Sequence, residues 1–200
     1  MRPAEAHCRD QTVFQVILAR HSVRSYAPRP VSESEIQTLL EAAVRAPTAL
    51  HQEPWAFVVI QDPAWLKRIS DVARPLFLHN LLHKTGSGNA RTVKTFADPH
   101  FNVFHDAGTL IVICASPDLP FAQADCWLAA ENLMLAACSL GLGSCVIGSA
   151  QEALNTPAVK AELGIPPEYS AVAPIVVGHP SGEAAATGRK TPQVLAWKRP

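Results

Sequence analysis

Residues 121–148, FAQADCWLAAENLMLAACSLGLGSCVIG, contain the longest predicted helix of the chain and a glycine-rich turn. The first part of this stretch, residues 121–140, is rich in alanine and leucine and is apolar on nearly every side, which predicts a long helix in the centre of the molecule. Gly141 ends this helix, and the Gly-Leu-Gly turn that follows leads into a short predicted strand at 144–147. We therefore expect the rest of the chain to pack around this helix.

Three more apolar runs predict buried strands on either side of that stretch. They are WAFVVI at 55–60, TLIVICA at 109–115 and the run from Ser170 to Val177. Each run is short, rich in β-branched residues and bounded by turn residues, as buried strands are. With the strand at 144–147, the sequence contains four predicted strands that alternate with helices.

Polar caps predict the remaining helices: 12–20, 32–45, 63 to about 73, and 157–163. Residues 79–104 have few periodic apolar positions, and GSGNARTVK at 86–94 predicts a mobile loop. The segment 79–104 is therefore expected to be the least regular part of the chain, and its role is left open.

Length and composition are typical of one large domain with a partner. The 200 residues contain no internal repeat or linker, so we expect a single domain over 1–200, with a core at about 10–180 and an extended arm at 181–200. Only 17% of the residues are charged, against a usual level of about 25%. This light charge predicts that a partner covers part of the surface.

The charge balance and the cysteines exclude several classes of protein. Seventeen basic and 17 acidic residues cancel, which gives no electrostatic support for binding nucleic acid or an anionic membrane. Five scattered cysteines without a C-x-x-C pair are typical of a reduced cytoplasmic chain. The N-terminus lacks an apolar signal core, and no run approaches the roughly 20 apolar residues of a membrane span. We therefore expect a cytoplasmic protein.

No side chain stands out as a nucleophile or as a metal ligand. His79 and His83 are four residues apart but lack an H-E-x-x-H context, so we expect no metal site there. Cys145 follows a glycine-rich turn and is the one cysteine that merits comparison with a nucleophile. The sequence has no G-x-S-x-G, no P-loop and no G-x-G-x-x-G after the first strand.

Residues 20–24, RHSVR, gather two arginines, a histidine and a serine in a chain with few charges. One interpretation is a solvated helix end, where basic side chains face the negative end of the helix dipole. The other is an anion pocket, because guanidinium and hydroxyl groups together suit a phosphate. These five residues alone leave both interpretations open.

Four separated segments together resemble the nitroreductase family of FMN-dependent oxidoreductases. RHSVR matches the family's R-x-S-x-R/K motif, and APTALHQEPW at 46–55 matches its A-P-S/T-x-x-N-x-Q-P-W loop. ENLMLAACSLGLGSCVIG at 131–148 matches its N-L-x-L-A-A-x-x-x-G-L-G helix and turn, and GRK at 188–190 supplies a basic pair in the arm. In order and spacing these motifs cover nearly the whole chain.

The resemblance implies that RHSVR is an anion pocket for FMN. Arg20 and Ser22 are implied to bind phosphate and ribityl oxygens, with backbone contacts from His21. Arg24 is implied to lie at the pyrimidine end of the ring, where a cation stabilises the charge that develops on reduction.

Three further segments are implied to complete the cofactor site. Ile147 and Gly148 would bring backbone amides to the flavin edge near N5. The arm would close over the phosphate with Arg189 or Lys190. The loop residues implied to contact the flavin of the partner subunit are Pro47, Thr48, Ala49 and His51. Two positions depart from the family pattern, since His51 replaces the usual Asn and Glu53 the usual Gln, so their contacts stay open.

The resemblance also implies a fold and an assembly. The expected fold is α+β, with a central, mostly antiparallel sheet flanked by helices. The expected assembly is a homodimer with FMN sites at the subunit interface and the helix 121–140 in that interface. The C-terminal arm would be exchanged, with VLAW at 194–197 adding a fifth strand to the partner's sheet.

The implied function is hydride transfer from NADH or NADPH through flavin N5 to a small electron-poor acceptor such as a nitroaromatic or a quinone, in a ping-pong mechanism. No catalytic side chain is expected, because the flavin carries the chemistry. Two alternatives stay open. One is a non-catalytic FMN-binding or storage protein, and the other is a specialised branch that carries out flavin fragmentation, dehalogenation or azoline oxidation.

Overall fold

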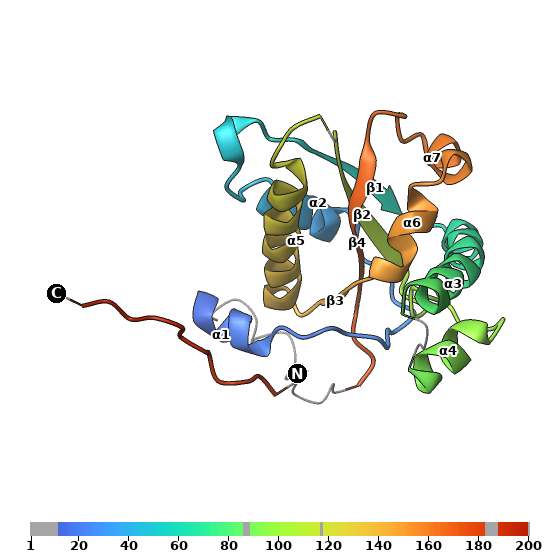
Figure 1. Cartoon of the computed structure of the whole chain (residues 1–200), viewed down its shortest axis with the longest axis horizontal. Coiled ribbons are helices and arrows are strands. Elements are labelled where there is room, and N and C mark those ends of the chain that lie inside the picture. The colour runs from blue at the N-terminus through green and yellow to red at the C-terminus, as the bar shows by residue number, and fades with distance from the viewer. Residues whose placement is uncertain (1–11, 86–88, 117, 183–187, 200) are drawn as a thin grey trace.

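The computed structural model describes residues 12–85, 89–116, 118–182 and 188–199, and it confirms the predicted α+β class (Figure 1). Within these residues four strands form one antiparallel sheet in the order β1-β2-β4-β3. Their bounds are Trp55–Ile60 (β1), Thr109–Ala115 (β2), Gly143–Val146 (β3) and Ser170–Gly178 (β4). All four predicted strands are thus present, although β1 is only half-buried because it lies at an edge of the sheet.

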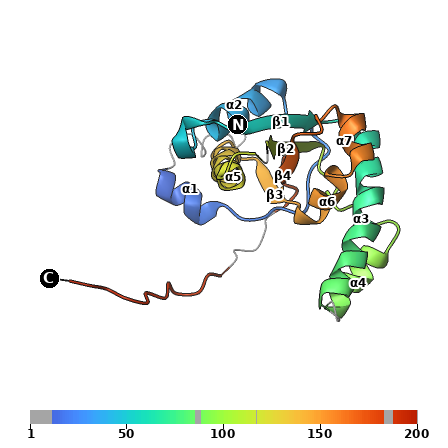
Figure 2. The same ribbon diagram turned by 45° about the horizontal axis from the view of Figure 1, so that its top comes forward.

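Helices cover both faces of this sheet (Figures 1 and 2). The seven residues of β2 are all buried and alternate between the two faces. Ile111 and Ile113 contribute to the core beneath α2 (Glu33–Ala43) and α5 (Ala122–Ser139). The opposite face, with Leu110 and Val112, forms a second core that is covered by α3 (Pro63–Thr85), α6 (Gln151–Leu154) and α7 (Pro157–Leu163).

The helix predicted at the centre of the molecule is α5, and one side of it is exposed in the single chain. Eight of its residues are buried against α2 and the sheet. Asn132 donates a hydrogen bond of 3.2 Å to the backbone oxygen of Ala42, which satisfies its amide within the chain. Trp127 and Leu128 lie on the outer side and are 39% and 47% exposed. The helix is therefore central to the fold but is not enclosed by its own chain.

The polar caps at the starts of α1 and α2 are both capping boxes. Ser32 and Glu35 exchange hydrogen bonds at the start of α2, and Thr12 and Gln15 do so at the start of α1 (Val13–Ala19). Only Val16 of α1 is buried, however, and the other large apolar side chains of this helix are exposed: Val13, Phe14, Ile17 and Leu18. The apolar surface of α1 adds to that of α5.

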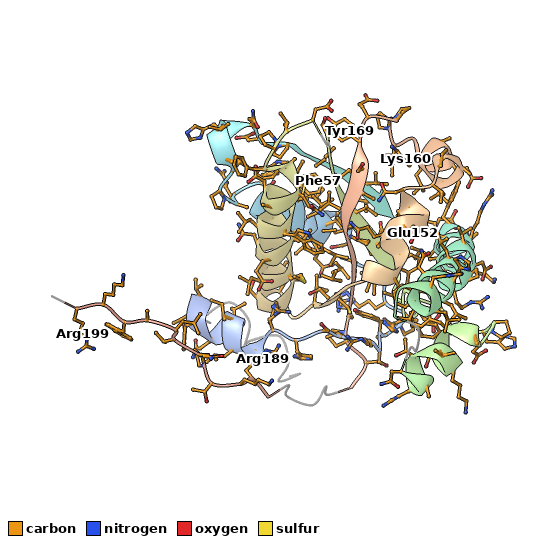
Figure 3. The ribbon with its side chains drawn as sticks, in the orientation of Figure 1. Phe57, Glu152, Lys160, Tyr169, Arg189 and Arg199 are labelled. Atoms are coloured by element: carbon orange, nitrogen blue, oxygen red, sulfur yellow. The ribbon has the colours of Figure 1, made fainter. Side chains whose placement is uncertain are left out.

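Residues 63–104 contain more helix than the sequence predicted. The helix expected to end near Ala73 continues as α3 through Pro75 to Thr85, and α4 (Ala90–Ala97) follows, so most of the segment 79–104 is helical. Pro75 removes one helical hydrogen bond, but tertiary contacts beyond it hold the helix. Leu76 packs against the core, and Asn80 of α3 donates to Glu152 of α6, which is labelled in Figure 3. Residues 86–88 of the predicted loop lie outside the described residues.

Three short elements were not predicted: the 3-10 turns η1 (Ala49–His51) and η2 (Gly148–Ala150), and α6 directly after η2. The arm at 188–199 is extended and leaves the body of the molecule, as Figures 1 and 2 show. Its apolar side chains are largely exposed in the single chain, with Leu195 at 89% and Trp197 at 71%. Among the described helices, none is both long and apolar enough to cross a bilayer. The exchange of the arm in a dimer stays a prediction.

Candidate functional site

The RHSVR segment begins at the C-terminal cap of α1, which is Arg20, and then continues along the sheet. The helix α1 ends at Ala19, and the chain then runs extended beside β3 and the end of β4. Val23 donates its amide to the carbonyl oxygen of Ser144 at 3.0 Å, and Ala27 donates to that of His179 at 2.8 Å. Residues 22–27 are therefore held at the edge of the sheet, so only the first residue of the motif has the helix-end position.

Close packing of Val23 on Gly143 holds the RHSVR segment against β3. A Cβ atom added at Gly143 would lie 2.7 to 2.9 Å from three atoms of the Val23 side chain, which is buried. We expect Gly143→Ala to lower the free energy of unfolding by roughly 1 to 3 kcal/mol, the usual cost of overpacking. Urea unfolding measures this, with Gly108→Ala as the control, because a Cβ there meets nothing within 4 Å. Equal stability of both variants would contradict the close contact.

Two neighbouring cavities border the segment. One of about 590 Å³ is lined by residues 21–25 and 180–182. The other, of about 230 Å³, is lined by residues 19–21 and 141–144, together with Val23, Cys138 and Pro180. The structure thus brings the first motif and the glycine turn of the third motif to one place, although 110 residues or more separate them in the sequence.

Arg20 is half-buried and lines the smaller of the two cavities. Its Nε lies 3.1 Å from Oε1 of Glu131 in α5, and this contact is an ion pair without hydrogen-bond geometry, because the buried Nε has no hydrogen-bond partner in the described part of the chain. Ser22 is exposed beside it, and His21 holds the backbone through a 2.9 Å contact from Nδ1 to the carbonyl oxygen of Ala19. The Arg20 guanidinium lines the smaller cavity and the Ser22 hydroxyl lines the larger one beside it. Groups of these two kinds are suited to bind an anion.

Arg24 is exposed, and its positive charge acts on Tyr26, on Cys145 in β3 and on His105 in the loop before β2. Burial lowers the pKa of His105, and the positive charge of Arg24 lowers it further. Burial raises the pKa of the Cys145 thiol, and Arg24 and a hydrogen bond with Ser22 offset only part of that rise. Cys145 therefore lacks the lowered pKa of a nucleophilic cysteine.

Ile147 and Gly148 follow β3 and differ in what they offer a ligand. The amide of Ile147 donates to the carbonyl oxygen of Pro174 at 2.8 Å, so it is already used within the sheet. Gly148 begins η2, and a Cβ added there would meet nothing within 4 Å. Of the two predicted residues, Gly148 is the one whose backbone a ligand can approach.

The loop at 47–53 lies at the opposite end of α5. Ala49 donates its amide to the carboxylate of Asp125 in the first turn of α5, whereas the pocket contacts Cys138 in the last turn. These positions of α5 are about 20 Å apart at 1.5 Å per residue. The predicted residues Pro47, Thr48, Ala49 and His51 therefore do not meet the pocket of their own chain.

The backbone of this loop is strained. Leu50, His51 and Glu53 have φ values of 56°, 54° and 44°, in the left-handed region that suits glycine. Each such residue costs roughly 1 to 3 kcal/mol, and the surrounding structure must stabilise it. The side chains of His51 and Glu53 are exposed.

Arg189 and Lys190 lie on the arm, outside the body of the molecule; Figure 3 labels Arg189 there. Neither residue lines the two cavities at RHSVR. The prediction that one of them closes over a phosphate therefore stays untested for the single chain.

The sequence did not reveal a third cavity of about 460 Å³ between α3 and the loop 99–108. Its polar lining comprises Lys67, Ser70, Asp71, His100, Asn102 and Asp106. In the described residues, no group of three or more histidines, cysteines or carboxylates is placed to hold a metal ion, and the rings of His79 and His83 pack on each other 4.3 Å apart.

Sequence reasoning also missed two carboxylates that touch the predicted site residues. Asp125 bonds the loop at Ala49, and Glu131 pairs with Arg20. Both are acidic residues in the otherwise apolar helix α5, and that contrast was the signal that could have marked them.

Comparison with known proteins gives one consistent result. Residues 17–179 match the model of the Nitroreductase family. A protein of Archaeoglobus fulgidus, named as a candidate NADH dehydrogenase/NAD(P)H nitroreductase, is 30% identical over 175 residues, which cover 85% of this chain and 86% of that protein. A nitroreductase with bound FMN from Bacteroides fragilis superposes with a TM-score of 0.76 at 26% identity, over 94% of this chain and 98% of that one. An FMN-dependent nitroreductase from Clostridium difficile has a TM-score of 0.73 at 24% identity, over 92% and 98% of the two chains.

Proposed function

This chain belongs to the nitroreductase family, and we propose that it is an FMN-dependent oxidoreductase that passes hydride from NADH or NADPH to a small electron-poor acceptor such as a nitroaromatic or a quinone. The observation that carries the proposal is the pocket at the sheet edge, where Arg20 and Ser22 meet the Gly141–Ser144 turn. Bound FMN would supply the hydride chemistry at its N5 atom.

The residues present fit FMN on chemical grounds. A dianionic phosphate needs a cation and hydroxyl donors, and the Arg20 guanidinium and the Ser22 hydroxyl provide them. Arg24 supplies an exposed positive charge a few residues further along the same edge, where it would stabilise negative charge on a reduced ring. Gly148 offers a backbone that a planar ring can approach without an intervening side chain.

We also propose that each site is shared between the subunits of a homodimer. The loop at 47–53 and the pocket lie at opposite ends of α5, so a second copy is needed to bring one of each together. The exposed apolar side chains on α1, on the outer side of α5 and on the arm are suited to such an interface. The low fraction of charged residues in the chain agrees with this assembly.

The visible spectrum of the purified protein tests the cofactor, and steady-state oxidation of NADH and NADPH with menadione tests the activity. We expect a yellow protein with flavin absorbance that oxidises at least one of the two nicotinamides when menadione is present. A yellow protein without turnover would favour a binding or storage role. A colourless protein that does not take up added FMN would contradict the proposal. Product analysis with oxygen or halogenated aromatics as acceptor distinguishes the specialised branches.

A further inference from the structure

We propose that Asp125 is a positioning residue that holds the loop 47–53 of its own subunit in place for the flavin of the partner subunit; this rests on the proposed function and its shared site. Asp125 lies in the first turn of α5 and is 4% exposed. Both of its carboxylate oxygens lie 3.2 Å from the amide nitrogen of Ala49, 76 residues earlier in the chain. The family motifs quoted above do not include this residue.

The apolar surroundings of Asp125 mean that its carboxylate would destabilise the fold if it had no hydrogen-bond partner. The neighbouring buried residues of α5 are apolar or weakly polar, among them Ala122, Cys126 and Ala129. A carboxylate in such a place destabilises a protein unless hydrogen bonds or charges compensate it. The N-terminal end of the α5 dipole offsets part of the cost, and the Ala49 amide offsets more. Among the described residues, the hydrogen-bond partner of this buried carboxylate is the loop alone.

The loop, in turn, depends on this contact. Within the described part of the chain, the bond from Ala49 to Asp125 is the one hydrogen bond that ties residues 47–53 to another element. The loop's own backbone contributes a single bond of 3.3 Å from the amide of Gln52 to the carbonyl oxygen of Ala49. Three left-handed residues follow Ala49 closely, and they persist only if an anchor outweighs their strain. Asp125 supplies that anchor.

The position of the anchor links the loop to the proposed interface. Trp127 and Leu128 follow Asp125 on the same helix and point outward with much of their surface exposed. The helix that would meet the partner subunit therefore also carries the residue that fixes the loop. A shift of the loop against α5 would change its placement at the partner's flavin without any change in the pocket of its own subunit.

The anchor is tested first without flavin or turnover, by hydrogen exchange of the Ala49 amide in the full chain. Asp125→Ala is expected to raise the exchange rate of this amide by about tenfold or more, because a hydrogen bond is lost. Asp125→Asn keeps an acceptor oxygen and is expected to retain most of the protection. The control is Asp71→Asn, the same change at an exposed ion pair with Lys67. Unchanged exchange in Asp125→Ala would overturn the anchor.

The action on the partner's flavin is tested with mixed dimers of the holoprotein. One subunit carries Arg20→Ala, which damages the pocket, and the other carries Asp125→Ala, which damages the loop. In a mixed dimer, one site then combines the intact pocket with the intact loop, whereas each homodimer has only damaged sites. We expect menadione-dependent NAD(P)H oxidation to fall about tenfold or more in both homodimers and to return to about half of the wild-type rate in the mixed dimer.

The outcomes separate the two proposals. If the homodimers are impaired and the mixed dimer does not recover, Asp125 acts on its own subunit's site or on folding, and the inference is wrong. Wild-type activity in the Asp125→Ala homodimer would be equally decisive against it. If the wild-type protein itself neither binds FMN nor oxidises a nicotinamide, the proposed function fails, while the exchange of Ala49 still decides the anchor.

Discussion

Replacing Arg20 with alanine is expected to weaken FMN binding by roughly 10- to 150-fold, which corresponds to the 1.5 to 3 kcal/mol of a hydrogen bond to a charged group. Arg20 is half-buried at the mouth of the cavity, and its Nε is oriented by Glu131. Removal of the guanidinium takes away the phosphate's cation and leaves the Glu131 carboxylate unpaired near the bound anion. Both effects weaken binding in the same direction.

Titration of the apoprotein with FMN, followed by quenching of flavin fluorescence at fixed salt, measures the loss. Arg68→Ala is the matched control, because Arg68 is also paired with a glutamate, Glu162, but lies on α3 away from the cavity. Arg20→Lys is expected to lie between the parent and Arg20→Ala, since it keeps the charge and loses the fork. An Arg20→Ala protein with the parent's dissociation constant would remove Arg20 from the phosphate site.

Truncation after Gly182 is expected to weaken dimerisation by on the order of 100- to 1000-fold and to release FMN. The arm exposes Val194, Leu195 and Trp197 in the single chain. Burial of three such side chains contributes roughly 1.5 to 3 kcal/mol each before the cost of ordering the arm. The same truncation removes Arg189 and Lys190, so the phosphate would also lose a cation. Sedimentation velocity over a dilution series, with flavin and protein absorbance recorded together, measures both effects.

A second truncation, after Thr191, separates the two parts of the arm. It removes the apolar segment 194–197 and keeps the basic pair. We expect this shorter deletion to weaken the dimer nearly as much, and to lose less FMN at protein concentrations where the dimer still forms. A flavin-loaded dimer that withstands dilution after truncation at Gly182 would show that the arm is not exchanged.

Local signals predicted the elements with an apolar pattern and clear caps. The strands at 55–60, 109–115 and 170–177 and the helix α5 follow from runs of buried side chains bounded by turn residues. The polar cap of the helix predicted at 32–45 placed the start of α2 to within one residue. These features depend on neighbours in the sequence, and therefore the sequence alone is enough to predict them.

Features that depend on distant contacts were not predictable in this way. Pro75 is a helix-ending signal, but packing of the residues beyond it carries α3 on for ten more. Leu50 has a left-handed backbone although it is not a glycine, so the sequence around it does not predict this conformation. The loop is stabilised instead by Asp125, 75 residues later in the chain. The family motifs identified the pocket residues, but they did not show that the pocket and the loop are separated along one helix.

That separation has a consequence for how this protein tolerates change in length. Between Asp125 and Cys138, α5 acts as a spacer, with the loop fixed at one end and the pocket at the other. Insertion or deletion of one residue in this span would turn one end against the other by about 100° and move it by about 1.5 Å. Because a second copy would have to match the same spacing, both sites of a dimer would be misaligned at once. Substitutions in the span are absorbed locally by packing, whereas changes in its length are not, so we expect variation in length to be confined to the surface segments that α5 does not connect.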